Sequence, residues 1–131
     1  MKSIVILYHN DEDGFGAAWA AWKKFKNRAS YIPVEYKNRT AYLEKLKNKE
    51  IYLLDVCFNG KIMKKLLEEN KKLVVIDHHI GRTEESKIST ERFFDIKFSA
   101  AVLSWKFFHP GKPAPNLLRY VEDFDIWKMK M

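Results

Sequence analysis

Three groups of acidic and imidazole side chains in this sequence each follow an apolar run. The groups are His9-Asn10-Asp11-Glu12-Asp13-Gly14, the single Asp55, and Asp77-His78-His79. Carboxylate oxygens and imidazole nitrogens bind divalent cations, and a set dominated by carboxylates favours manganese or magnesium over structural zinc. The set is larger than one ion can use. It therefore indicates two ions sharing a bridging carboxylate, at the roughly 3.5–4 Å separation typical of two-metal centres that cleave phosphoryl groups.

Purely structural roles account for these groups less well than a metal site does. An Asp-x-Asp-Gly segment also occurs in calcium loops, but these close with an acid at the position that Ala20 holds here, which excludes an EF-hand. Asp13 could cap the following helix, with or without binding a metal. Adjacent histidines after Asp77 would be costly to bury without partners. We therefore favour a metal site over structural coincidence.

The apolar runs before the three groups predict buried β-strands, over residues 4–8, 51–54 and 73–76. Strands that alternate with helices are joined by right-handed crossovers and form a largely parallel sheet. The carboxyl ends of parallel strands meet at one edge, where open α/β folds build their sites. We expect an α/β fold of the doubly wound type, a mainly parallel sheet with helices on both faces, and a single pocket at that edge.

The helix expected from Gly14 to about Phe25 carries a stripe of apolar side chains at three- and four-residue steps. The stripe is Phe15, Ala18, Trp19, Trp22 and Phe25, and Ala17, Ala20 and Ala21 would let the helix lie close to the sheet. Because Trp19 and Trp22 fall on this stripe, a place in the core is favoured over stacking on nucleic-acid bases.

The remaining elements are predicted from turn and capping residues. Pro33 makes a short strand over 31–35 a candidate sheet edge, and Asn59 caps a helix that follows the second strand. The others are a helix from Thr40 to about Leu46, a polar loop over 81–89 covering the pocket, a strand within 91–98, and helices over 99–108 and 116–124. The last of these helices delivers Asp123 and Asp125.

Composition narrows the class of protein. The 131 residues predict one domain, 47% of them are hydrophobic, and no apolar stretch approaches the roughly 18 residues that span a bilayer. The amino terminus runs into a strand rather than a signal peptide. Cys57, the only cysteine, has no disulfide partner and is expected to be packed. We expect a cytoplasmic protein. The net charge of +7 suits a polyanionic partner, but many of the lysines fall in helical stretches, where they would form ordinary solvated faces.

Taken in order, the motifs resemble those of the DHH phosphoesterase superfamily. They are His9-x-Asp11-x-Asp13-Gly14, Asp55 after a strand, Asp77-His78-His79, the Ser99-Ala100-Ala101 helix start, and Asp123-Phe124-Asp125-Ile126-Trp127. That superfamily includes RecJ-type exonucleases, oligoribonucleases, cyclic-dinucleotide phosphodiesterases and manganese inorganic pyrophosphatases. The resemblance covers essentially the whole chain and implies a Mn²⁺-dependent phosphoesterase domain.

The resemblance also implies a role for each site residue. One ion would be held by His9, Asp11 and Asp55, and the other by Asp13, Asp55, His78 and Asp123, with Asp125 as the competitor of Asp123. Asp77 would orient the neighbouring histidine, and His79 would face the scissile phosphate, stabilising its charge or helping the leaving oxygen. Two cations would make hydroxide available from a bridging water near neutral pH. Arg82 is a candidate phosphate contact, with a solvated loop arginine as the alternative.

The sequence departs from the nuclease-type relatives in one respect. Those relatives continue into a second, smaller substrate-gripping domain, whereas this sequence stops at Met131, so a single catalytic domain over 1–131 is expected. Either another chain or a homodimer contact completes the cleft, or the pocket takes small substrates, or the catalytic domain lacks its companion. The leading hypothesis is hydrolysis of short oligonucleotides or nucleotides with Mn²⁺, or alternatively Mg²⁺. The rivals are a non-hydrolysing nucleic-acid or partner-binding module and an inorganic pyrophosphatase.

Overall fold

The computed structural model describes residues 1–35 and 41–130, and for Ala41 and residues 124–130 it describes the backbone only. Within these ranges a five-stranded sheet has the order β2-β1-β3-β4-β5, with every neighbouring pair parallel. The strands are β1 (Ile4–His9), β2 (Ala29–Val34), β3 (Glu50–Leu54), β4 (Lys72–Asp77) and β5 (Glu91–Phe94). The helices are α1 (Glu12–Phe25), α2 (Gly60–Glu69), α3 (Thr83–Ser86), α4 (Ala100–Phe108) and α5 (Asn116–Lys130), with short 3₁₀ helices η1 (Lys26–Arg28), η2 (Ala41–Lys45) and η3 (Ile80–Arg82).

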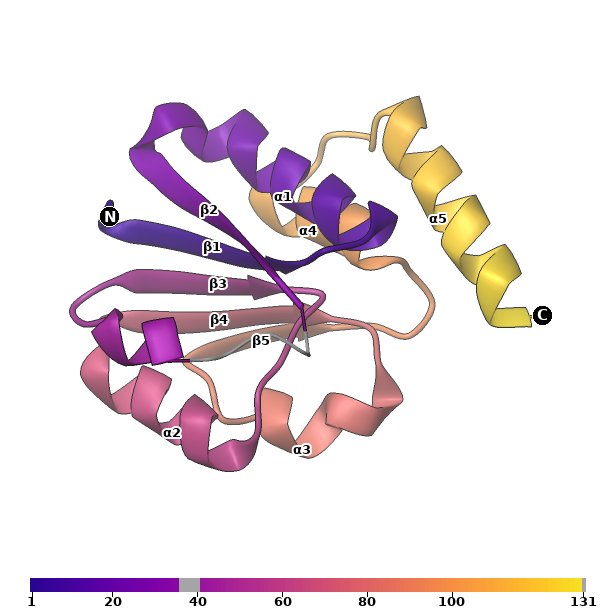
Figure 1. Cartoon of the computed structure of the whole chain (residues 1–131). Helices are drawn as coiled ribbons and strands as arrows, with labels where there is room; N and C mark the ends of the chain where they lie inside the picture. The colour runs from indigo at the N-terminus through magenta and orange to yellow at the C-terminus, as the bar shows by residue number, and fades with distance from the viewer. Residues whose placement is uncertain (36–40, 131) are drawn as a thin grey trace.

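Helices cover both faces of the sheet, so the predicted doubly wound α/β fold is confirmed. In Figure 1, α1 and α4 lie on one face, α2 and α3 lie on the other, and α5 packs outside α1 and α4. Alternate strand residues supply the two cores: Ile6, Leu54 and Ile76 face α1 and α4, while residues such as Leu7 and Leu53 face the opposite side. Because both faces are buried, the central strands β1, β3 and β4 are apolar at most of their positions.

The strand order places a topological switch beside β1. The chain passes from β1 to β2 on one side and later returns to β3 on the other. In open α/β sheets of this order, the crevice outside the carboxyl ends of the strands at the switch point is where ligands bind. The predicted groups after β1 and β3 lie at that point.

Most predicted elements agree with the structure. β2 is an edge strand, as Pro33 indicated, and Asn59 caps α2 by accepting a hydrogen bond from the Ile62 N–H. The loop expected over 81–89 instead contains η3 and α3, and the last helix continues beyond residue 124 to Lys130. The predicted helix start at Thr40 lies outside the described residues, and η2 is a 3₁₀ helix.

The predicted core stripe of α1 is wrong for two of its members. Phe15 is 65% exposed and Trp22 is 41% exposed, whereas Ala18 and Phe25 are buried. The innermost face consists of small residues, Gly16, Ala17, Ala20 and Ala21. A Cβ atom on Gly16 would lie only 2.9 Å from the Cβ of Ala101 on α4. Because α1 packs closely against both the sheet and α4, small side chains rather than large ones occupy the inner face.

Two expectations from composition can be compared with the structure. Among the described residues, no helix combines the length and apolar character needed to cross a membrane. Cys57 is buried, with its Sγ 3.8 Å from the Sδ of Met63, which confirms its packing role.

Candidate metal centre

The first group of site residues lies where β1 meets α1. Asp11 is the N-cap of α1: its Oδ1 accepts a hydrogen bond of 2.7 Å from the Gly14 N–H, and its Oδ2 lies 2.9 Å from His9 Nδ1. The alternative of Asp13 as the cap is therefore wrong, because Asp11 holds that position. Gly14 permits this geometry, since a Cβ there would lie 1.8 Å from the His9 carbonyl oxygen. The cap and the tight first turn together fix His9 and Asp11 side by side.

Asp13 is buried and connects α1 to the start of α4. Its Oδ1 accepts a hydrogen bond of 2.8 Å from the Ala101 N–H, and its Oδ2 accepts one of 3.0 Å from the Ala100 N–H. These N–H groups belong to the first helical turn, which leaves them without helical acceptors and where the helix dipole also favours negative charge. Oδ2 is also 3.2 Å from His78 Nε2. The side chain of Asp13 is thus fixed by the start of α4 and directed at a histidine that follows β4.

Asp55 occupies the centre of the site. It is only 1% exposed and has a φ of 61°, a left-handed conformation that aspartate tolerates better than most residues but that still stores strain. Oδ2 lies 3.7 Å from His9 Nδ1, and Oδ1 lies 3.3 Å from His78 Nε2 and 3.4 Å from His79 Nδ1. Despite these neighbours, Oδ1 is a buried atom without a hydrogen-bond donor. A buried carboxylate oxygen without a donor is costly unless a cation binds it.

The third group follows β4 and is organised by Asp77, which is fully buried. Its Oδ1 accepts hydrogen bonds from His79 Nδ1 at 2.7 Å and from the His78 backbone N–H at 2.7 Å. Its Oδ2 accepts one of 3.2 Å from Arg82 Nη1. This arrangement supports the predicted orienting role of Asp77, which acts through the His79 ring and the His78 backbone.

Arg82 lies in η3 and contacts the residues at the ends of β3 and β4. Its Nη1 also donates a hydrogen bond of 2.9 Å to the Asp55 carbonyl oxygen, so one guanidinium nitrogen joins the ends of β3 and β4. A solvated loop arginine, the alternative for this residue, does not fit a side chain that is only 20% exposed. Contact with a substrate phosphate stays a prediction.

Charge pairing fixes the protonation of the cluster. Burial acts to raise the pKa of Asp55, but the close approach and positive charge of His78, His9 and His79 outweigh it and lower the pKa to about 2. Burial acts to lower the pKa of His78, but Asp13 and Asp55 outweigh it and raise the pKa to about 10. Asp55 similarly raises the pKa of His9 against burial. The cluster therefore holds anionic carboxylates and attracts positive charge, which either protons or metal ions can supply.

The described residues contain two groups able to hold a metal ion, and the groups share Asp55. Ligand atoms lie within 4.8 Å of one another in each group, the first being His9, Asp11 and Asp55 and the second Asp55, Asp77, His78 and His79. Asp13 joins the second group through its 3.2 Å contact with His78. The carboxylate-rich donors and the buried Asp55 Oδ1 without a donor fit divalent cations. The cluster predicted from three separated motifs is therefore assembled at one edge of the sheet.

The sequence did not decide which acid of helix α5 belongs to the site. Asp123 is exposed and belongs to neither group of described ligand residues, so its role as a ligand stays a prediction, and the side chain of Asp125 lies outside the described residues. The acid of α5 that contacts the neighbourhood of the site is Glu122, whose Oε2 accepts hydrogen bonds from the Ser99 N–H at 2.8 Å and Oγ at 3.2 Å. The sequence motifs did not point to Glu122. The signal that could have found it is Ser99, whose position at a helix start requires an acceptor nearby.

Comparison with known proteins agrees with this geometry. The model of the DHH family, N-terminal domain, matches residues 3–117. An uncharacterized protein, R106 of Acanthamoeba polyphaga mimivirus, is 30% identical over 143 aligned residues, which cover 97% of this chain and 34% of that protein. The crystal structure of an uncharacterized protein from Helicobacter pylori G27 superimposes with a TM-score of 0.76 at 20% identity, over 98% of this chain and 44% of that one.

These similarities have different weights. The likeness to the Helicobacter pylori protein shows the fold, and the chain spans less than half the length of both similar proteins. The family match covers most of the sequence, includes all three strand-end motifs, and carries with it metal-dependent phosphoester hydrolysis as the suggested activity. The chain belongs to the DHH family.

Proposed function

We propose that this chain is the catalytic domain of a phosphoesterase that hydrolyses phosphodiester or phosphate bonds in short oligonucleotides or nucleotides, using two Mn²⁺ ions with Mg²⁺ as a substitute. The observation that carries the proposal is Asp55. It is buried in a strained backbone conformation, keeps one oxygen without a hydrogen-bond donor, and is common to both groups of ligand residues. A carboxylate that bridges two cations would account for all three features.

The two ions would have different ligands. His9, Asp11 and Asp55 would hold one of them, and Asp13, Asp55 and His78 would hold the other, with Asp123 as the further ligand from α5. Asp13 and Asp55 lie 3.2 and 3.3 Å from His78 Nε2, which supports the second set. Bound divalent ions lower the pKa of a coordinated water and offset charge on phosphoryl oxygens.

His79 and Asp77 would act on the substrate phosphate. Asp77 accepts a hydrogen bond from His79 Nδ1, which fixes the ring and directs Nε2 as the nitrogen that faces the substrate. The side chain of His79 is 38% exposed, so a phosphate can reach it. There it would stabilise the charge on the phosphate or give a proton to the leaving oxygen. Arg82 would keep Asp77 ionised and hold the ends of β3 and β4 together.

A turnover assay with a matched pair of variants tests the proposal. The protein is stripped with EDTA, reloaded with Mn²⁺ or Mg²⁺, and incubated with a dinucleotide, with pyrophosphate, or with a single-stranded oligonucleotide. Asp55→Asn is preferred to alanine because asparagine also tolerates the positive φ. Asp95→Asn is the control, since its Oδ1 only accepts a hydrogen bond from Lys97 in a turn.

Wild type and Asp95→Asn should cleave the nucleotide substrates only when metal is added, and Asp55→Asn should lose at least about a hundredfold in kcat. Metal content measured by mass spectrometry should fall in Asp55→Asn alone. Cleavage of pyrophosphate only would replace the proposal with a pyrophosphatase. Binding of oligonucleotide without any metal-dependent product would replace it with a non-hydrolysing module.

A further inference from the structure

An aromatic hollow lies between α1 and the strands β1 and β2. It has a volume of about 500 Å³ and is lined by Tyr8, Phe15, Ala18, Trp19, Trp22 and Tyr31. We call the five aromatic residues of this set the aromatic platform. The volume falls within the range of ordinary small-molecule sites. A surface built from five aromatic rings is unusual for a soluble domain, because exposed apolar side chains tend to be scattered.

The exposed rings of the platform contribute little to the fold. The inner face of α1 is formed by its glycine and alanine residues, while Phe15 and Trp22 are 65% and 41% exposed. Trp19 is partly anchored, because it stacks on Trp105 with ring centroids 6.0 Å apart. Phe15 therefore offers a largely exposed ring to whatever binds there, and Trp22 offers the part of its ring that the Lys26 ammonium, 4.1 Å from the ring centre, does not cover.

Two lysines contact rings of the platform. The Nζ of Lys26 lies 4.1 Å from the centre of the Trp22 ring, and the Nζ of Lys23 lies 5.7 Å from the Trp19 ring. The sequence from Gly14 to Val34 contains no aspartate or glutamate. Aromatic faces interleaved with ammonium groups are the combination with which proteins bind single-stranded nucleic acid, through base stacking and phosphate contacts.

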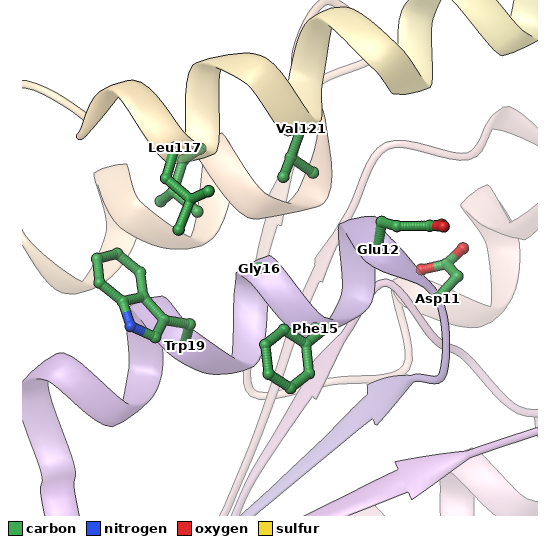
Figure 2. A pocket seen from close by; sticks show the side chains of 8 residues that line it. Asp11, Glu12, Phe15, Gly16, Trp19, Leu117 and Val121 are labelled. Carbon is green, nitrogen blue, oxygen red and sulfur yellow. The ribbon is translucent and has the colours of Figure 1, made fainter.

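The platform is continuous with the metal centre. Tyr8 directly precedes His9 on β1, and Phe15 lies one helical turn after Asp11. Phe15 and Trp19 also line a second groove, of about 490 Å³, together with Asp11 and Glu12. Figure 2 shows this groove, with Asp11 at the start of α1, Leu117 of α5 across from Trp19, and Val121 of α5 across from Gly16. At about 1.5 Å per residue, Trp22 lies roughly 16 Å along the helix from Asp11.

We infer that the aromatic platform stacks consecutive nucleobases of a single-stranded oligonucleotide whose phosphate lies at the metal centre. The inference rests on the proposed function and specifies its substrate: a chain of at least two or three nucleotides rather than a free nucleotide or pyrophosphate. Lys23 and Lys26 would contact the phosphates beside the stacked bases.

Binding measurements without metal test the platform separately from catalysis. The probes are fluorescein-labelled hexathymidylate and the same hexamer with abasic sugars, each titrated in EDTA and followed by fluorescence anisotropy. The variants are Phe15→Ala, Trp22→Ala and Trp22→Phe. Tyr120→Ala is the matched control, because Tyr120 is an exposed aromatic on α5, 73% accessible and outside both grooves. Phe15, Trp22 and Tyr120 are all solvent-accessible. A thermal melt checks that each variant is folded.

Phe15→Ala and Trp22→Ala should each weaken binding of the thymidylate by about fivefold to a hundredfold, as expected for the loss of one base stack. Neither should change binding of the abasic probe, and Trp22→Phe should restore most of the affinity. Equal effects on both probes, or none, would overturn the inference. So would an unchanged affinity accompanied by loss of self-association in sedimentation, which would make the platform a contact between two copies of this chain.

Adding Mn²⁺ to the same samples separates the two proposals. Base-dependent binding without any cleavage rejects the proposed hydrolysis and keeps the platform. Cleavage of both probes at equal rates by wild type and Trp22→Ala keeps the hydrolysis and rejects the platform.

Discussion

Replacing Gly14 with alanine should damage the metal centre, although alanine is the better helix former. Gly14 lies in the first turn of α1, and its Cβ would lie 1.8 Å from the oxygen and 2.7 Å from the carbon of the His9 carbonyl group. Real Cβ atoms essentially never come closer than 3.0 Å to another heavy atom. The neighbour is backbone, so no side-chain rotation can relieve the clash.

The magnitude follows from two opposing effects. Helix propensity favours alanine over glycine by about 1 kcal/mol, whereas overpacking that moves backbone costs about 1–3 kcal/mol. To reach 3.0 Å the His9 carbonyl oxygen must retreat by more than 1 Å, and this oxygen also accepts a hydrogen bond of 2.9 Å from the Asp11 N–H. Subtracting the gain in helix propensity from the cost of overpacking gives an expected net destabilisation of up to about 2 kcal/mol. His9 and Asp11 move with the backbone, and a misplacement of about 1 Å can lower turnover by about a hundredfold.

Three measurements decide the outcome: the melting temperature without metal, Mn²⁺ affinity by calorimetry, and kcat on the best oligonucleotide substrate. Gly81→Ala is the control, because nothing lies within 4 Å of a Cβ at Gly81 and its φ is outside the left-handed region. We expect Gly81→Ala to match wild type in all three. A Gly14→Ala protein that melts no lower than wild type and binds Mn²⁺ equally well would refute the reasoning.

Three further predictions concern the acids and histidine of the site. Asp13→Asn should lower the metal-free melting temperature more than Asp55→Asn, because Asp13 accepts two backbone hydrogen bonds whereas Asp55 Oδ1 accepts none; the reverse order in thermal melts would contradict this. If Asp123 is a ligand, Asp123→Asn should reduce bound Mn²⁺ from two ions towards one. Glu122→Gln, which only weakens the contact to Ser99, should keep both ions and cost about 1 kcal/mol in chemical denaturation. Because the pKa of His78 is raised to about 10, Mn²⁺ should displace a proton near pH 7. Calorimetry in buffers of different ionisation enthalpy should detect that proton, and its absence would contradict a protonated His78 in the metal-free protein. The pKa of His78 in the folded protein is higher than the ordinary value of 6.5. The ion pairs of His78 therefore stabilise the metal-free protein fully below pH 6.5, and this stabilisation is lost as the pH rises through about 10.

The parts of the fold that could be predicted are those encoded by residues close together in the sequence. Ile51–Leu54 and Leu73–Ile76 are apolar because both faces of the sheet are covered, and each run ends directly in a ligand. Parallel pairing then brings Asp55 and Asp77 to one edge without any further information. The acids following β1, β3 and β4 could be predicted for this reason.

The contribution of α5 could not be predicted in the same way. Glu122 and Asp123 are adjacent in sequence, but neighbouring helical positions point about 100° apart, and the rotation of α5 depends on how it packs against α1 and α4. Leu118 and Val121 settle that rotation, since they pack near Gly16 and Ala101. The sequence alone does not show that contact, so it could not reveal that Glu122 is directed towards Ser99.

The inner face of α1 was mispredicted for a reason that also bears on function. Hydrophobic periodicity assigns the largest apolar residues to the core, but a helix that packs closely on both a sheet and another helix needs glycine and alanine there. Gly16, Ala17, Ala20 and Ala21 meet that need, which leaves Phe15 and Trp22 outside. Phe15 and Trp22 are 65% and 41% exposed, so they bury less apolar surface than core rings do, and exposed aromatic side chains carry a risk of aggregation. The inferred stacking of substrate bases beside the metal centre would give these exposed rings a role.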